Sequence, residues 1–155
     1  MDKADPDESL MREALRVARR ATRRGEVPVG AVLTRDGRVV SRGGNATVAR
    51  SDPTAHAEVI ALRRAARILG GPRLSGCTLY VTLEPCLMCL GAMVQARIAR
   101  CVFGARDPKV GATRWLDEPA VRRGLNHRFP VEGGVLEEEA ARLPRSFFRS
   151  RRRKS

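Results

Sequence analysis

Residues 77–89, CTLYVTLEPCLMC, join an apolar run to a pair of cysteines. The run Cys77–Leu83 predicts a buried strand. Pro85 predicts the start of a helix, since proline is tolerated in a first turn, where its missing N–H needs no partner. In that helix Cys86 and Cys89 lie three residues apart and therefore share one face. The segment predicts a strand that leads two thiols to the start of a helix.

Upstream of this segment the pattern alternates between helices and strands. Residues 9–24 carry apolar side chains at helical spacing and predict a helix. Val27–Leu33 and Arg38–Ser41 predict a hairpin, because the Asp36-Gly37 pair between them favours a tight turn. A second helix is predicted from Pro53 to Leu69, where a Gly-Gly-Pro sequence ends it.

Downstream, the pattern predicts a short strand at Cys101–Phe103, a further strand at Val131–Leu136 and a final helix at Glu137–Arg153. Pro144 lies inside that helix and is expected to kink or break it. Strands that alternate with helices of this length predict an α/β domain in which helices cover a sheet.

Length and composition fit a single domain spanning residues 1–155, with 43% apolar residues to build its core. We expect residues 1–8 to be disordered and residues 150–155 to form a frayed basic tail. No run approaches 18 consecutive apolar residues, which argues against a membrane span. The acidic, polar start lacks the pattern of a signal peptide. We therefore expect a cytoplasmic protein whose four cysteines are reduced thiols or metal ligands.

The chain is strongly basic, with 30 lysines and arginines against 17 acidic residues and a formal charge of +13. An excess of this size indicates a polyanionic partner, most plausibly nucleic acid. Almost all the basic residues are arginine, so a codon bias toward arginine is an alternative explanation. Charge alone does not identify the nucleic acid.

Two short motifs have the spacing of a catalytic metal site, His56-Ala57-Glu58 and Pro85-Cys86-Leu87-Met88-Cys89. Each lies in the first turn of a predicted helix. One imidazole and two thiolates supply three ligands for zinc, which prefers four and so retains a position for water. Such a water ionises near pH 7. Glu58 lies close to the metal and is placed to move the proton of that water to a leaving nitrogen.

Each motif alone has a plainer explanation. A Cys-x-x-Cys pair occurs in redox proteins, cysteines are often core residues, and a lone histidine is often a hydrogen-bonded core residue. A structural zinc site would need a fourth ligand, for which Cys77 and Cys101 are the candidates. Both lie in apolar strand patterns and fit better as core thiols. The two motifs together, in this order, favour the catalytic site.

These residues resemble the established H-x-E…P-C-x-x-C signature of zinc nucleobase deaminases, in the cytidine and deoxycytidylate deaminase superfamily. The resemblance extends to the bacterial tRNA-specific adenosine deaminase family through segments that need no gaps: Glu26–Val32, Asp52–Glu58, Leu79–Cys86, Val102–Asp107, Leu125–Arg128 and Phe147–Arg149. It implies a three-layer α/β fold, the cytidine-deaminase-like fold, with a mixed central sheet flanked by helices. It also implies zinc, a homodimer, and hydrolytic conversion of the wobble adenosine in a tRNA anticodon stem-loop to inosine.

The resemblance assigns three residues to the base pocket. Asn45 would hold the flipped nucleoside, and Val29 and Leu83 would form the walls around the base. Burial preferences alone would make Val29 and Leu83 ordinary strand-core residues. The match to the family favours the pocket assignment.

The resemblance also assigns contacts with the RNA. Asp107 would contact the backbone of the anticodon loop, and Phe147 and Phe148 would help to seat the loop, although both rings could equally pack a terminal helix. Two positions depart from the family pattern. Trp115 is a bulky aromatic on the expected RNA side, and Pro144 interrupts the terminal helix pattern. Both departures concern RNA specificity and not the zinc chemistry.

Two competing functions remain open. A deaminase of free bases or nucleosides, such as guanine or cytosine, would use the same zinc site, although the basic excess favours a polymeric substrate. A non-catalytic nucleic-acid-binding module with structural zinc would have no use for the carboxylate of Glu58.

Overall fold

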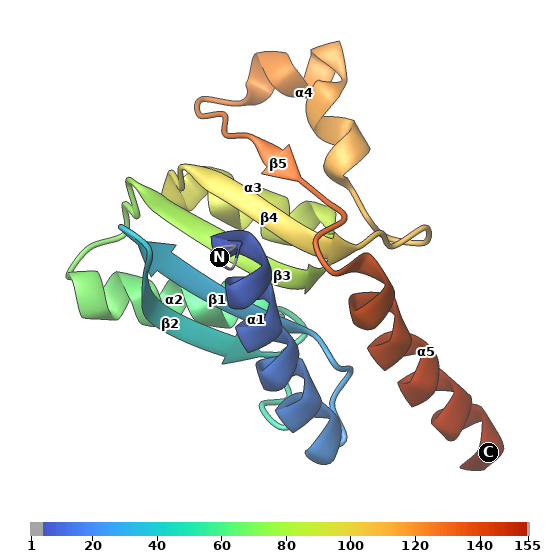
Figure 1. Cartoon of the computed structure of the whole chain (residues 1–155). Helices are drawn as coiled ribbons and strands as arrows, with labels where there is room; N and C mark the ends of the chain where they lie inside the picture. Colours follow the sequence, from blue (N-terminus) through green and yellow to red (C-terminus); the bar gives the residue numbers. More distant parts are fainter. Residues whose placement is uncertain (1–4, 155) are drawn as a thin grey trace.

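The computed structural model describes residues 5–154, which form one five-stranded sheet and its covering helices (Figure 1). The elements in chain order are α1 (Pro6–Arg23), β1 (Gly30–Arg35), β2 (Arg38–Gly44), α2 (Ala57–Leu69), β3 (Cys77–Leu83), α3 (Leu87–Ala96), β4 (Arg100–Ala105), a 3-10 helix (Thr113–Asp117), α4 (Pro119–Gly124), β5 (Val131–Glu132) and α5 (Glu137–Lys154).

The sheet is mixed, with strand order β2-β1-β3-β4-β5. Strand β1 runs antiparallel to both β2 and β3, whereas β3, β4 and β5 run parallel to one another. The β1–β2 hairpin closes through Asp36 and Gly37, both with positive φ, which is the backbone conformation of a tight two-residue turn. The predicted hairpin and the predicted strand Cys77–Leu83 are confirmed.

Helices cover both faces of the sheet, as Figure 1 shows, with α1 and α5 on one face and α2 and α3 on the other. The side chains of β1 alternate accordingly. Ala31 and Leu33 belong to the core on the α2–α3 face, and Val32 packs with Met11 of α1. The expected three-layer α/β fold of the cytidine-deaminase type is confirmed.

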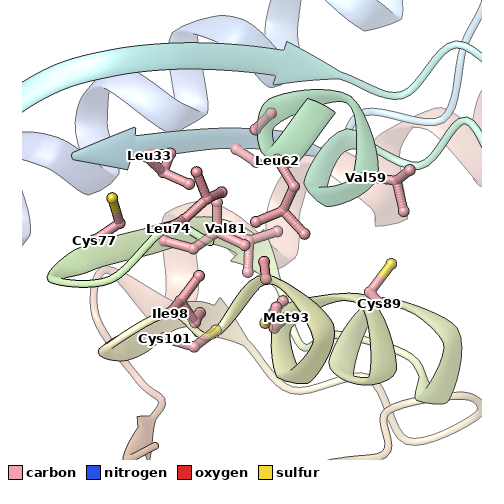
Figure 2. Close-up of a cluster of buried hydrophobic side chains, with 14 of the residues drawn as sticks. Leu33, Val59, Leu62, Leu74, Cys77, Val81, Cys89, Met93, Ile98 and Cys101 are labelled. Carbon is pink, nitrogen blue, oxygen red and sulfur yellow. The ribbon is translucent and has the colours of Figure 1, made fainter. Parts of the chain in front are cut away.

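The larger core lies between the sheet and the α2–α3 layer (Figure 2). Leu33, Leu79 and Met93 are fully buried there, and each such side chain contributes about 1.5–3 kcal/mol of burial free energy. Cys77 and Cys101 lie in the same cluster as free thiols, and burial raises the pKa of both. They are core thiols, as predicted.

Two glycines allow helices to approach the sheet closely. A Cβ atom on Gly30 would lie 2.1 Å from the carbonyl oxygen of Ala14 in α1. A Cβ atom on Gly43 would lie 2.5 Å from the carbonyl oxygen of Ala57, the first residue of α2. The second contact fixes where α2 begins, and α2 begins next to His56.

Helices α2 and α3 begin later than predicted, at Ala57 and Leu87 rather than at Pro53 and Pro85. The carboxylate of Asp52 accepts hydrogen bonds from the backbone N–H and the hydroxyl of Thr54, and this local turn competes with helix. His56 and Cys86 therefore occupy the N-cap positions and not the first helical turns.

The predicted disorder of residues 1–8 is wrong for residues 6–8, which begin α1 after the N-cap Asp5; residues 1–4 lie outside the described residues. Asp7 is held in place because its carboxylate pairs with Arg100 of β4. The predicted strand Val131–Leu136 is shorter and consists of Val131–Glu132 alone.

The predicted break at Pro144 and the frayed tail are also wrong, since α5 continues through Pro144 to Lys154; residue 155 lies outside the described residues. Tertiary contacts hold the helix on both sides of the proline. Ala141 and Leu143 pack against the core, and the Arg151 guanidinium donates to the carbonyl of Gly25 over 2.7 Å. These contacts compensate for the N–H that proline lacks.

None of the helices within residues 5–154 combines the length and the hydrophobicity that crossing a membrane requires.

An ion-pair network ties the start of α1 to the sheet. Arg100 donates to both carboxylate oxygens of Asp7, over 3.0 and 2.6 Å, and also to Glu132 of β5. The hydroxyl of Tyr80 donates to the same Asp7 carboxylate over 2.7 Å. The hydrogen bond from Arg100 is the main cause of the lowered pKa of Asp7, while burial and then the bond to Asp7 raise the pKa of Tyr80 to about 12.

We predict that Asp7→Asn lowers the free energy of unfolding by about 1.5–3 kcal/mol at pH 7, the range for hydrogen bonds to charged groups. A carboxyl whose folded pKa is lowered stabilises the fold above its unfolded pKa and loses this effect as pH falls through the folded pKa. The deficit of the variant should therefore shrink below pH 4. Urea unfolding at pH 7 and at acid pH measures it.

Glu8→Gln is the matched control, since the ion pair that Glu8 forms with Arg12 at 3.7 Å is exposed. A deficit for Asp7→Asn that stays constant with pH, or one no larger than that of Glu8→Gln, contradicts the network's role.

Candidate functional site

His56 and Cys86 cap the two helices that cover one face of the sheet. Both N-cap residues have extended backbone, and neither side chain makes a capping hydrogen bond. Cys89 follows in the first turn of α3. In Figure 2 it lies at the end of the buried cluster, on the same side as Val59 of α2. The starts of α2 and α3 thus present three free metal-ligating side chains to one another.

The three donor atoms lie within 4.8 Å of one another. Nδ1 of His56 is 3.7 Å from Sγ of Cys86 and 3.5 Å from Sγ of Cys89. A tetrahedral zinc ion with ligands at about 2.0–2.3 Å separates its donors by about 3.3–3.8 Å. Imidazole and thiolate are also donors that zinc favours. The residues therefore fit zinc in both spacing and chemistry.

The donor group holds three members among residues 5–154. Cys77 and Cys101, the candidates for a fourth ligand, belong to the hydrophobic core instead. Three protein ligands are the set found at catalytic zinc sites, whereas structural zinc sites use four.

Hydrogen bonding among the donors favours ionisation of one thiol. The bond from the Cys89 thiol, followed by that from His56, lowers the pKa of Cys86 to about 4. The bond between His56 and Cys86 raises the pKa of His56. The bond between Cys89 and Cys86, followed by burial, raises the pKa of Cys89. A thiolate is the form of cysteine that binds metal.

Glu58 lies in the first turn of α2, two residues after His56, and its side chain is 4% exposed. Burial raises the pKa of its carboxyl, which favours the protonated form. A carboxyl of this kind beside the donor group can hold a proton and release it.

Val29 and Asn45 lie together, since the backbone N–H of Asn45 donates to the carbonyl of Val29 over 3.1 Å. Asn45 follows β2 and is 7% exposed. Its side-chain amide donates to Glu26 over 3.4 Å, and Glu26 also accepts the backbone N–H groups of Val48 and Ala49. Glu26 thus holds the loop that contains Asn45.

Glu84 anchors a second loop, the one that follows β4. Its carboxylate accepts the backbone N–H of Asp107 over 3.0 Å, and both the N–H and the hydroxyl of Thr113. Although burial opposes it, the bonds from Thr113 and Asp107 keep the pKa of Glu84 low. Glu84 thereby ties the loop after β4 to the residues beside Cys86.

The roles of Glu26 and Glu84 were not predicted from the sequence. Each is a lone acid in an otherwise apolar segment, EVPVGAV and LYVTLEPC, and that isolation was the available signal.

The structure brings Leu83, Asp107 and Phe148 together along one groove of about 760 Å³ between the end of β3, the loop after β4 and α5. The carboxylate of Asp107 accepts the backbone N–H groups of Lys109 and Val110, so it also shapes its own loop. Basic side chains share the groove: Arg106, Lys109, Arg145, Arg149, Arg151 and Arg152.

Phe147 does not line this groove. It lines a second cavity of about 690 Å³ between α1 and α5, under the guanidinium of Arg151 at 4.9 Å. Its ring meets that of Phe148 edge to face at 5.4 Å. Trp115 is 44% exposed and stacks with Arg114 at 5.1 Å, and it too lies outside the groove.

Residues 4–105 match the family described as the cytidine and deoxycytidylate deaminase zinc-binding region. The chain is 48% identical over 151 residues to the tRNA-specific adenosine deaminase of Haemophilus influenzae, covering 94% of this chain and 85% of that protein.

Two solved structures share the fold. One, from a study of A-to-I editing by tRNA:A34 deaminases, has a TM-score of 0.81 and 47% identity over 87% of this chain and 98% of its own. The other, guanine deaminase from Nitrosomonas europaea, has a TM-score of 0.79 and 25% identity over 95% of this chain and 86% of its own. The family match, the high identity and the donor geometry agree. The chain belongs to the zinc-binding cytidine and deoxycytidylate deaminase family and, within it, to the tRNA-specific adenosine deaminases.

Proposed function

We propose that this protein deaminates the wobble adenosine of a tRNA anticodon stem-loop to inosine, in the cytoplasm. The observation that carries the proposal is the donor group His56, Cys86 and Cys89 beside the buried carboxyl of Glu58. The substrate is inferred from the relatives, because the identity of 47–48% to the tRNA-specific enzymes exceeds the identity of 25–31% to guanine deaminases.

In this proposal His56, Cys86 and Cys89 hold the metal. Zinc, when bound, supplies Lewis acidity and lowers the pKa of water toward neutrality. Water adds to C6 of adenine and Glu58 takes its proton. Glu58 then delivers a proton to the amino nitrogen, the C6–N bond breaks, and ammonia leaves as the ring keeps the oxygen. The buried site keeps the carboxyl protonated between these two transfers, since burial favours its neutral form.

The surroundings would bind the nucleotide and its loop. Asn45 is proposed to hold the flipped nucleoside, with Val29 and Leu83 as pocket walls, and Asp107 to contact the loop backbone. Phe147 and Phe148 on α5 would seat the loop above them. The basic groove beside Leu83, with Arg106 and Lys109 at one side and the arginines of α5 at the other, supports this assignment because it suits a phosphate backbone.

We predict that purified protein holds about one zinc per chain and that Cys86→Ala loses most of it, since two ligands do not complete the site. Glu58→Gln is the matched control. It should keep the metal and the fold yet lose turnover by about 10²–10⁴-fold, because an amide cannot carry a proton. Elemental analysis and inosine formation measure the two effects.

Unchanged zinc in Cys86→Ala would remove that residue from the ligand set. Half of the wild-type rate in Glu58→Gln would mean that another group moves the proton.

We predict that an anticodon stem-loop with adenosine at the wobble position is deaminated far faster than free adenosine or guanine. A loop base can be turned out into a pocket for a few kcal/mol or less. Its phosphates meet a protein of charge +13, so kcat/KM for the RNA should fall steeply with added salt. A free base has no phosphate and should show almost no salt dependence.

Guanine or cytosine turned over as fast as the stem-loop, or an RNA reaction insensitive to salt, would replace this function by that of a free-base deaminase.

We also propose a homodimer, as the family resemblance implies and as C2 symmetry makes common. Leu87 and Met88 at the start of α3 and the nearby Trp115 are exposed apolar side chains suited to a subunit contact. Light scattering at micromolar concentration should give twice the chain mass of 17.0 kDa. A mass of one chain would remove the proposed dimer and any RNA site shared between subunits.

A further inference from the structure

A second basic groove lies beside the loop that carries Asn45, and it shares no lining residue with the groove beside α5. It has a volume of about 320 Å³ and is formed by α1, the end of β2, the loop that follows and α2. Five arginines line it: Arg20, Arg24, Arg42, Arg50 and Arg64. None of these residues belongs to the donor group or to the groove of Leu83.

Two of these arginines bind other groups of the protein. Arg42 pairs with Glu13 of α1, and Arg64 donates to the carbonyl of Arg42 over 2.8 Å. The other three do not. Within residues 5–154, the guanidinium groups of Arg20, Arg24 and Arg50 form no ion pair and no hydrogen bond.

Few acids oppose this charge. Glu13 is paired with Arg42, and Glu26 is 1% exposed with its carboxylate committed to the loop backbone. Asp52 pairs with Arg63 outside the groove lining. The groove therefore keeps a large uncompensated positive charge.

The floor of the groove is apolar, since Val17 and Ile60 are buried beneath the arginine side chains. A low-dielectric floor with charges at its rim strengthens the attraction of an anion. Gly44 is buried at the end of β2, and a Cβ there would lie 3.0 Å from the Arg24 guanidinium. The Arg24 guanidinium thus packs against the backbone next to the loop that carries Asn45.

The groove and the base pocket share one loop. Gly44 and Ala46 line the groove, whereas Asn45 between them is buried and bonded to Glu26. If Asn45 holds the target nucleotide, the neighbouring phosphates of the same strand would lie within reach of the groove on the opposite side of this loop.

We propose that Arg20, Arg24 and Arg50 bind backbone phosphates of the RNA strand that flanks the target nucleotide. The proposal rests on the proposed function for its substrate. It adds a second backbone contact surface, separate from that of α5 and built on α1 and the 44–50 loop. Arginine is suited to this role because its planar fork binds phosphate oxygens bidentately.

The test is a triple variant, Arg20→Gln, Arg24→Gln and Arg50→Gln, which leaves Arg42 and Arg64 in place. Affinity for a fluorescent anticodon stem-loop RNA is measured over a range of salt concentrations. Each lost contact with single-stranded phosphate removes about 0.7 from the slope of log affinity against log salt, so the slope should fall by about 2.

The matched control is Arg38→Gln, Arg67→Gln and Arg73→Gln. These exposed arginines lie at the opposite end of the sheet, near the start of β2 and the end of α2, and give the same change in net charge. The control should keep the wild-type slope and bind within about twofold at physiological salt, where distant charges are screened.

A triple variant with the wild-type slope overturns the proposal. An equal loss in the control, or an affinity loss of the same size at every salt concentration, also overturns it. Inosine formation by the wild-type protein is assayed in parallel. If RNA binds through the groove but is not deaminated, the proposed function is rejected while the RNA-binding role of the groove is retained.

Discussion

The meeting of two helix starts is the constraint on which the site depends. His56 and the Cys86–Cys89 pair are 30 and 33 residues apart in the chain, yet their donor atoms lie within 4.8 Å. This closeness requires α2 and α3 to lie on one face of the sheet with their N-termini at the same end. Gly43 sets the depth of α2, and the parallel strands β3 and β4 position α3 between them. The hydrophobic core beneath both helices keeps these starts in register.

Much of this arrangement was predictable because its signals are local. The apolar run Cys77–Leu83 and the Asp36-Gly37 turn are each a few residues long, and both strand and hairpin were predicted. The donor set follows from spacing within two short motifs. Helix starts were less predictable. Proline at 53 and 85 favours a first helical turn, but the turn made by Asp52 delays α2 and the extended backbone of Cys86 delays α3. The effect of Pro144 was overestimated, since contacts distant in sequence sustain α5.

The parts that were not predicted are assembled from distant segments. Glu26 and Glu84 carry no periodic pattern, and their importance appears only when their partners are known. The five-arginine groove draws on three separate stretches of chain, so the sequence displays it only as general basicity. A strong net charge predicted a polyanionic partner but not where that charge would be concentrated. Burial and topology decide that placement.

Glu26 anchors its loop through backbone groups and not through the loop's exposed side chains. Its carboxylate accepts the backbone N–H groups of Val48 and Ala49, and these groups are present whatever side chains stand there. Val48 is itself 74% exposed. Mutations of the exposed side chains of this loop are therefore expected to leave its anchor intact and to change the free energy of unfolding little. The surface chemistry of this loop can therefore be changed while the contacts that hold Asn45 in place stay the same.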